Sequence, residues 1–161
     1  MLVVADSSPL IALAIIDGLP LLDSLYRNVR VPQAVFDEVT QQGKVQSKRL
    51  EEYLEPRMLL VQNTLAVAAF RAELGPGESE ALVCAMENKA DFILLDDYKA
   101  RETARLNGLP VVGSLGVLIL AKRHDLIPAL KPYIETLRTN GIWISQAVVK
   151  TALSAVGELV E

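Results

Sequence analysis

The sequence predicts a layered α/β fold, in which a central parallel sheet is covered by helices on both faces. Three observations predict this fold. The chain has 161 residues, the usual size of one compact domain. It is 51% hydrophobic but only 5% aromatic, so its core must be mostly aliphatic, as in layered α/β proteins. Short apolar runs alternate with helical patterns, which indicates βαβ units. No repeat or linker interrupts them, so we expect one domain over residues 1–161.

The first part of the chain alternates strand and helix signals. Short strands are expected in MLVVAD (1–6) and NVRVP (28–32). Between them, SPLIALAIIDG has a serine before a proline at its start and a glycine at its end, which favours a helix, and GLPLLDSLY suggests another. Pro32 is expected to open a helix that Gly43 ends. SKRLEEYLEP continues the helical pattern, with Pro56 as its stop.

The remaining elements follow the same alternation. Strands are expected in MLLVQN, DFILLDD and LPVVG, and the second of these is the clearest in the chain. Helices are expected in GPGESEALVCAMENKA, in YKARETARLNG before Gly108, and in SLGVLILAKRHDL, whose basic last turn complements the helix dipole. Two more helices are expected near 129–139 and 145–155, on either side of GIWIS.

Acidic side chains follow two of the best strand predictions. LVVAD ends in Asp6, and FILLDD ends in Asp96 and Asp97. Ligands of parallel α/β sheets bind outside the carboxyl ends of the strands, so these carboxylates mark a candidate site. Each has a structural alternative. Asp6 could form an Asx-turn or cap the following helix, and Asp96 could cap the helix that starts near Tyr98. Because a cap needs only one acid, the adjacent pair is harder to explain in this way.

Glutamates on two expected helices could join these aspartates. In PQAVFDEV, Glu38 lies at the margin of the apolar stripe, whereas Asp37 points further away. In GPGESEALVCAM, Glu78 and Glu80 occupy the first turn. Acids in a first turn also simply favour the helix dipole. This alternative stays open for both glutamates and is the stronger for Glu78.

Convergence of these acids would require a cation. Asp6, Glu38, Glu80 and Asp97 could not all stay ionised in one cleft, because like charges at close range raise each other's pKa. A hard divalent ion resolves this conflict, and ligation by oxygen alone selects Mg²⁺ or Mn²⁺ over zinc. Such an ion suits the attack of water on a phosphodiester.

The chain offers little for a zinc or thiol site. His124, the only histidine, is expected at a helix end beside two basic residues, where it complements the helix dipole. Cys84, the only cysteine, cannot form an internal disulfide, which fits a reducing cytosol. It lies in an apolar helical run, so we expect a buried, inert thiol.

Basic residues follow the paired aspartates, namely Lys99, Arg101 and Arg105. The two arginines are i,i+4 neighbours on one helix face and could hold substrate phosphates. In an alternative that is nearly as well supported, Arg101 pairs with Asp97 one turn back, which would still order the site.

The overall charge and hydropathy limit the classes of partner. A net charge of −4 argues against a protein held to nucleic acid by a large positive field, but not against an enzyme that meets phosphates locally. There is no signal-peptide pattern and no apolar stretch long enough to span a bilayer. We therefore expect a soluble cytoplasmic protein without a membrane partner.

Four blocks of the sequence resemble, in order, those of PIN-domain proteins. They are VVADSSPLIAL, VRVPQAVFDEV, GPGESEALVCAMENKADFILLDDYKAR and LPVVGSLGVLILAKRHDLI, and the likeness continues into LRTNGIWIS. The likeness is greatest to a prokaryotic branch near the VapC toxins, once described as a domain of unknown function. The resemblance implies a Rossmann-like three-layer α/β/α sandwich that gathers three or four acids around Mg²⁺ or Mn²⁺ to cleave single-stranded or structured RNA.

The resemblance also implies individual roles. The four family acids match Asp6, Glu38, Glu80 and Asp97, with Asp96 as a close second for the last. Ser7 matches the small hydroxyl residue that often follows the first aspartate. There are two departures from the VapC pattern: the third acid is a glutamate, and two aspartates follow Leu95 where a hydroxyl residue and one aspartate are usual.

The leading hypothesis is a metal-dependent endoribonuclease, the toxin of a toxin–antitoxin pair. Asp6 and Asp97 would bind the metal, with Asp96 and Glu80 as further ligands, while Glu38 and Glu80 complete the shell or orient water. The resemblance implies an RNA substrate, a small antitoxin protein and a homodimer.

Three alternatives belong to other classes. A PIN-like module without catalysis would bind RNA or a partner protein, but it would gain nothing from a negative cleft. A phospho-accepting receiver domain would carry its acid pair after the first strand and a lysine after the last, and LPVVGS has no lysine. A phosphatase of the haloacid dehalogenase type would need Asp-x-Asp where this chain has Asp6-Ser7-Ser8.

Overall fold

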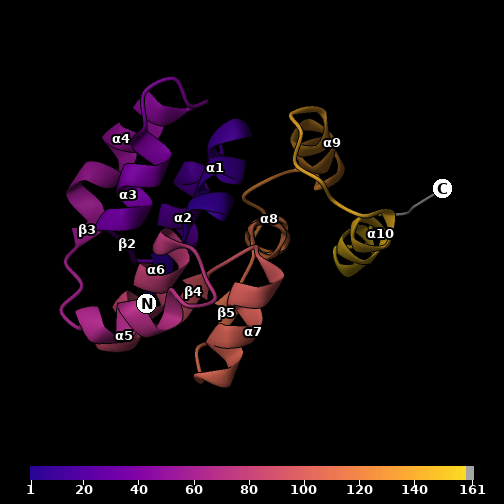
Figure 1. Ribbon diagram of the computed structural model, residues 1–161. Helices are drawn as coiled ribbons and strands as arrows, with labels where there is room; N and C mark the ends of the chain where they lie inside the picture. The colour runs from indigo at the N-terminus through magenta and orange to yellow at the C-terminus, as the bar shows by residue number, and fades with distance from the viewer. Residues whose placement is uncertain (159–161) are drawn as a thin grey trace.

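Five short parallel strands form the centre of the molecule. The computed structural model describes residues 1–158, and its strands lie in the order β3-β2-β1-β4-β5 (Figure 1). Their bounds are β1 Leu2–Ala5, β2 Asn28–Pro32, β3 Met58–Leu59, β4 Phe92–Leu94 and β5 Val111–Val112. Every pairing in the sheet is parallel, so the predicted α/β fold with a central parallel sheet is confirmed.

Helices connect the strands and continue beyond the last one. The first four are α1 Ser7–Ile15, α2 Leu19–Leu25, α3 Gln33–Thr40 and α4 Ser47–Leu54, followed by a 3₁₀ turn, Glu55–Arg57. The middle three are α5 Thr64–Phe70, α6 Pro76–Glu87 and α7 Tyr98–Leu106. The last three are α8 Ser114–Arg123, α9 Lys131–Thr139 and α10 Gln146–Ala155.

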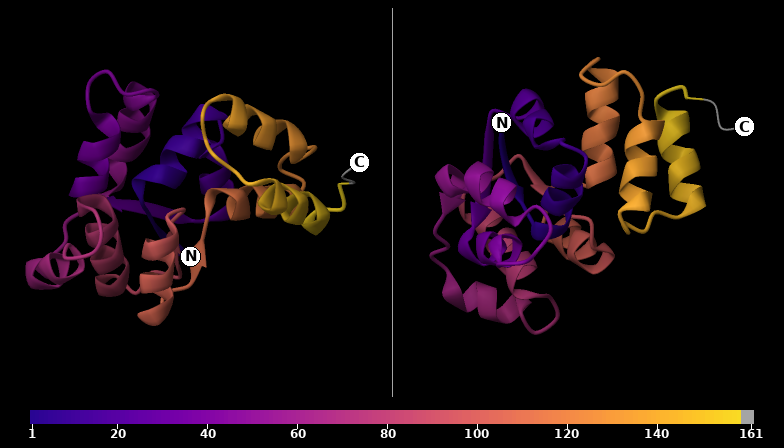
Figure 2. Two further views of the ribbon diagram at one scale, coloured as in Figure 1. Left: turned by 45° about the vertical axis from the view of Figure 1, so that its right-hand side comes forward. Right: turned by 90° about the horizontal axis from the view of Figure 1, so that it is seen from above.

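The connections place helices on both faces of the sheet. From β1 the chain moves outward through β2 to β3, then returns to β4 beside β1 and moves the other way to β5. Since crossovers between parallel strands are right-handed, the two directions put their helices on opposite faces. In Figure 1, α1 to α4 accordingly lie above the sheet and α5 and α7 below it. Helices α9 and α10 lie beside α8, at the end of the molecule away from α5 (Figure 2).

The reversal of direction occurs between β1 and β4, and it positions the candidate site. Ala5 of β1 is registered with Leu94 of β4, and the backbone amide of Asp6 donates to the carbonyl oxygen of Leu94 at 3.0 Å. The chain therefore leaves these two strands side by side, in the crevice where doubly wound sheets bind ligands. Their last residues are fully buried aliphatics, which holds this edge in place.

Three local features differ from the sequence expectations. The helix after Pro32 ends at Thr40, and Gly43, with φ +83°, lies in the turn beyond it. The strand expected in MLLVQN covers only Met58 and Leu59, the two residues that pair with β2. Helix α5 was not predicted. Its N-cap Asn63 accepts a hydrogen bond from the Ala66 amide at 3.0 Å, but none of its residues is fully buried, so it lacks the apolar periodicity of a packed helix.

No single helix between residues 1 and 158 is long and apolar enough to cross a bilayer. Helices α1 and α2 meet the length and composition criteria only when taken together, across a bend of 111°.

Candidate functional site

Asp6 occupies the centre of the candidate site. It directly follows β1 at the N-cap position of α1, yet its side chain makes no capping hydrogen bond. The residue is 2% exposed, and within residues 1–158 its Oδ1 atom has no hydrogen-bond partner. The capping alternative therefore does not explain Asp6. A buried carboxylate oxygen without a partner is costly, which points to a ligand.

The surroundings of Asp6 disfavour its ionised form. Burial is the main cause that raises the pKa of this carboxyl to about 7. A backbone hydrogen bond at Ser7 lowers the pKa, and the negative charges of Glu78, Glu38 and Asp96 add to the increase. These four acids thus form the cluster that the fold assembles at the switch point, called the acid cluster below. Shifted titration in a cleft with like charges is typical of catalytic and metal-binding carboxylates.

Glu38 links three segments of the chain. Its Oε2 accepts a hydrogen bond from Ser7 Oγ at 2.5 Å, and its Oε1 accepts one from the Gly77 amide at 2.9 Å. A Cβ at position 77 would lie 2.5 Å from Oε2, so only glycine allows this close approach. Glu38 is half-buried whereas Asp37 is exposed, as the apolar stripe predicted.

The two glutamates of α6 have different positions. Glu78 faces Asp6 closely enough to raise its pKa, while its Oε2 accepts a hydrogen bond from the Gly75 amide at 2.8 Å. The Glu80 carboxylate instead accepts a hydrogen bond from the Ala34 amide at 2.8 Å, in the first turn of α3. The structure therefore brings Glu78, not Glu80, to Asp6. Sequence reasoning ranked Glu78 lower because its first-turn position has a sufficient local explanation.

The adjacent aspartates after β4 also divide between two positions. Asp97 is exposed, and its Oδ2 accepts a hydrogen bond from the Ala100 amide at 2.9 Å, which makes it the N-cap of α7. Asp96 is half-buried and contributes to the raised pKa of Asp6. Its Oδ1 accepts a hydrogen bond from the Ser114 amide at 2.8 Å. The two adjacent aspartates therefore have different roles: Asp97 caps α7, and Asp96 belongs to the acid cluster.

The expected substrate-binding side chains are only partly near this cluster. Ser7 contacts it through Glu38. Arg101 Nη1 donates to the carbonyl oxygen of Leu95 at 3.1 Å, and no ion pair between Arg101 and Asp97 is present in the described part of the chain. Lys99 and Arg105 are exposed. Lys99 lies 3.5 Å from a carboxylate oxygen of Glu73, and Arg105 is 2.7 Å from one of Glu102.

The donor chemistry of the acid cluster fits a hard divalent cation. All four side chains offer carboxylate oxygens, the ligands that Mg²⁺ prefers, and Asp6 Oδ1 is left without another partner. However, no three acidic, histidine or cysteine side chains of residues 1–158 converge on one point. Glu38, Glu78 and Asp96 are each turned to a backbone amide instead. The sequence expectation that Asp6, Glu38, Glu80 and Asp97 surround one ion stays a prediction.

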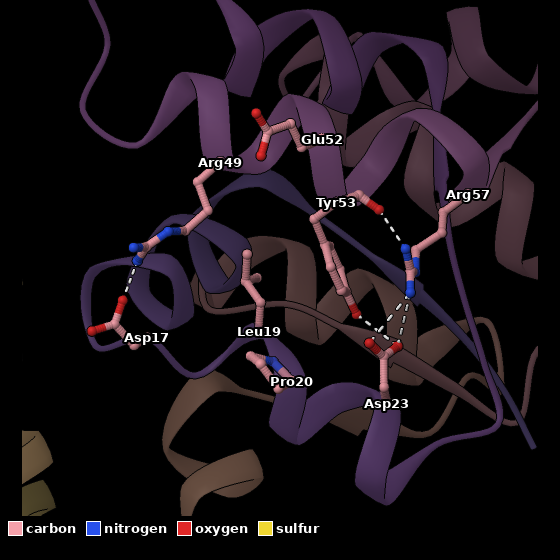
Figure 3. A pocket seen from close by; sticks show the side chains of 8 residues that line it. All are labelled: Asp17, Leu19, Pro20, Asp23, Arg49, Glu52, Tyr53 and Arg57. Atoms are coloured by element: carbon pink, nitrogen blue, oxygen red, sulfur yellow. Dashed lines mark hydrogen bonds and ion pairs between the residues drawn. The ribbon is translucent and has the colours of Figure 1, made fainter.

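A cavity of about 470 Å³ lies elsewhere, between α2 and α4 (Figure 3). Four of its charged side chains pair with one another. Arg57 donates to both carboxylate oxygens of Asp23 at 3.1 and 3.2 Å and stacks 3.9 Å above the Tyr53 ring, while Arg49 pairs with Asp17. None of the acid cluster lines this cavity, so we do not assign chemistry to it.

Comparison with known proteins gives one positive finding. The model of a family described as a PIN domain matches residues 2–158, which is nearly the whole chain. No curated protein and no solved structure matches the chain.

Proposed function

The chain belongs to the PIN-domain family, whose fold is nuclease-like, and from this premise we propose that it is a metal-dependent endoribonuclease that hydrolyses RNA phosphodiester bonds. The expected resemblance to PIN domains is confirmed by the family match. The narrower likeness to a toxin branch stays a prediction.

One observation supports the proposal above all others. A buried carboxylate, Asp6, has one unpartnered oxygen and a pKa raised to about 7, and it faces three further acids at the switch point of a parallel sheet. A domain that needed only stability would gain from replacing this arrangement by apolar residues. The presence of this arrangement favours a catalytic or metal-binding role.

The acid cluster suggests a division of roles that differs in two positions from the sequence hypothesis. We assign Asp6 and Asp96 to cation binding, because they follow the paired strands β1 and β4. Glu38 and Glu78 lie on helices across from them and would complete the ligand shell or accept a proton from the attacking water. Glu80 and Asp97 would act indirectly, by fixing the first turns of α3 and α7.

A bound Mg²⁺ or Mn²⁺ supplies positive charge that favours deprotonation of water and stabilises the leaving oxygen of a phosphodiester. The residues of the chain would orient these groups. Ser7 holds Glu38 through its hydroxyl, and the Ser114 amide holds Asp96, so the carboxylates are positioned before a substrate arrives.

The biological setting follows from the resemblance alone. On that basis we propose an RNA substrate, a small antitoxin protein as inhibitor and a homodimer as the assembled toxin.

A second candidate function has an observation in its favour. The carboxylates of Glu38, Glu78 and Asp96 already accept backbone hydrogen bonds, and no three potential ligands of residues 1–158 converge. This arrangement would suit a PIN-like module that has lost catalysis and binds RNA or a protein. The two candidates differ in their affinity for divalent metal.

The test is cleavage of a mixed pool of structured RNAs in Mg²⁺ or Mn²⁺, with Asp6→Asn beside the unmodified protein. Asp125→Asn is the matched control, because Asp125 is exposed beyond α8 in a left-handed conformation that asparagine also adopts. We expect metal-dependent cutting that only Asp6→Asn abolishes. Calorimetric titration with Mn²⁺ completes the test, since an unmodified protein that binds no metal would contradict the nuclease proposal.

A further inference from the structure

A groove adjoins the acid cluster on the side of β5. Its volume is about 640 Å³, and it is lined by residues of α7, β5, α8 and the segment 142–148, which includes the start of α10. This volume lies within the range of about 300–1,000 Å³ that is usual for ligand sites. The nuclease proposal assigns no role to this groove.

Two arginines and two aromatic residues line the groove. Arg101 and Arg123 are its basic residues, and Asp96 is the one acid among the residues that line it. Trp143 is 86% exposed and Tyr98 75% exposed, which is unusual for rings of this size. The groove therefore combines local positive charge with accessible aromatic faces, on a chain whose net charge is −4.

The arginines retain capacity for a ligand. Arg101 donates through Nη1 to the Leu95 carbonyl oxygen, and Arg123 donates through Nη2 to the Ala155 carbonyl oxygen at 3.2 Å. Neither forms an ion pair within residues 1–158. Since a guanidinium carries five N–H donors, each side chain is anchored by a carbonyl and can still bind a phosphate.

The groove and the acid cluster share residues. Asp96 belongs to both, and Ser114, whose amide donates to Asp96, also lines the groove. A Cβ on Gly113 would lie 2.5 Å from Arg101 Nη1 and 2.9 Å from Asp96 Oδ1, so both side chains border the space above this glycine. A ligand bound in the groove would therefore extend directly to the acid cluster.

From these contacts we propose that the groove binds a single-stranded nucleotide of the RNA substrate, next to the phosphate that is cut. The base stacks on Trp143 or Tyr98, and the neighbouring phosphates bind Arg101 and Arg123. This inference rests on the proposed nuclease function and narrows its substrate to RNA with an unpaired base, because bases inside an A-form duplex cannot stack on a side chain.

RNA explains the groove better than a protein partner does. Aromatic faces beside arginines are the combination that binds single-stranded nucleic acid, since every base has a π-face and every linkage a negative charge. An apolar peptide would fill the groove but leave both guanidinium groups without a counter-charge.

Trp143 provides a direct test because it is the only tryptophan of the chain. Its emission is followed while a six-residue oligouridylate is added in EDTA, which prevents cleavage. We expect saturable quenching by the oligonucleotide and none by the same RNA sequestered in a duplex or by an abasic chain of equal charge.

Variants identify the contacts by polarisation of a labelled oligonucleotide. Trp143→Ala is expected to weaken binding about 10-fold or more, the usual range for the loss of a stacking partner. Its control is Leu106→Ala, since Leu106 is likewise 86% exposed but lies outside the groove. Arg123→Ala should lower the slope of log affinity against log salt concentration by about 0.7 per lost phosphate contact. Arg27→Ala should leave this slope unchanged, because Arg27 lies outside the groove, just before the amino end of β2.

Each outcome decides the inference separately from the nuclease proposal. Quenching of Trp143 emission by the oligonucleotide, together with weaker binding in Trp143→Ala, supports RNA binding in the groove. If no RNA is cut in that case, the nuclease proposal alone fails. If Trp143→Ala and the unmodified protein bind the oligonucleotide with equal affinity, the proposed RNA binding in the groove is overturned, even if RNA is cut. The inference is also overturned if the emission of Trp143 does not change when RNA is added but shifts to the blue as the protein concentration rises, because a second copy of the chain would then cover Trp143.

Discussion

The hydroxyl of Ser7 donates a hydrogen bond of 2.5 Å to Oε2 of Glu38, across 31 positions of the sequence. With the Gly77 amide on the other oxygen of Glu38, this contact joins the chain after β1 to helices α3 and α6. The same carboxylate helps to raise the pKa of Asp6. Glu38 therefore has two roles: its hydrogen bonds hold three segments of the chain together, and its negative charge raises the pKa of Asp6.

Replacing Glu38 separates these two contributions. Glu38→Gln keeps an acceptor for one donor but removes the charge, so we expect RNA cleavage to fall about 100-fold or more, as for loss of a catalytic acid or base. The fold should persist, as far-UV circular dichroism would show. Asp37→Asn is the control, because Asp37 is exposed and its Oδ1 contacts only Gln33 in the same helix. Equal activity of the two variants would contradict a role for Glu38.

The paired aspartates are expected to give opposite phenotypes. Asp97→Ala removes the N-cap of α7 and should lower the free energy of unfolding by about 1 kcal/mol, with cleavage retained. Asp96→Asn should abolish cleavage with little change in stability, because it keeps an acceptor for the Ser114 amide. Urea denaturation and initial cleavage rates measure the two effects. Loss of activity in Asp97→Ala alone would restore the sequence-based ranking of these residues.

The glutamates of α6 form a second pair of this kind. Glu78→Gln should reduce cleavage because it removes a charge beside Asp6 while keeping an acceptor for the Gly75 amide. Glu80→Ala should reduce stability by about 1–3 kcal/mol, the cost of leaving a part-buried amide, that of Ala34, without a partner. Cleavage by Glu80→Gln, which retains an acceptor, should stay close to that of the unmodified protein. A larger activity loss in Glu80→Gln than in Glu78→Gln would refute this assignment.

Asp6 should make the stability of the metal-free protein depend on pH. Its pKa is raised from 3.8 to about 7, so between these values the folded protein binds more protons at this site than the unfolded chain. This contribution to the free energy of unfolding therefore falls as pH rises from 4 to 7 and is constant outside that window. The total decrease is on the order of 4 kcal/mol.

Asp6→Asn removes this dependence. Unfolding in urea with EDTA, measured from pH 4.5 to 8, should show the variant gaining stability relative to the unmodified protein up to pH 7. Saturating Mg²⁺ should reduce the difference, because a cation stabilises the ionised carboxylate. A difference between the two proteins that does not vary with pH would argue against the buried, protonated state.

Gly113 is expected to be required where the acid cluster meets the groove. The added methyl of Gly113→Ala would displace both Arg101 and Asp96, so cleavage should fall while folding persists, because the displaced atoms are the ends of side chains. Gly18→Ala serves as the control, because Gly18 lies outside the groove at the N-cap of α2 and its added methyl would meet its nearest atoms, of Ile16 and Leu13, at 3.3 Å. Similar cleavage rates for both would show that position 113 is not restrictive.

Local patterns in the sequence were sufficient for most of the fold. Apolar runs followed by helical periodicity predicted the strands and nearly every helix, because burial on both faces of a parallel sheet leaves a strong local signal. Helix α5 left no such signal, since none of its residues is fully buried. The helix end at Thr40 was missed because Gly43 is suited to the turn but does not begin it.

The sequence by itself determined that acids would lie at the carboxyl ends of β1 and β4, since the parallel direction of the strands follows from the βαβ pattern. Only the tertiary structure decided which carboxylates face one another. Asp96 and Asp97, like Glu78 and Glu80, are separated by one or two positions, and both members of each pair have good local reasons to be acidic. The backbone amides of Ala34 and Ala100 bind one member of each pair, which leaves the other to Asp6. The Ala34 amide comes within reach of Glu80 only when α3 packs against α6, because hydrogen-bond partners distant in sequence have no local signature. The Ala100 amide is only three positions from Asp97, but either adjacent aspartate could have capped α7, and the fold decided which one does.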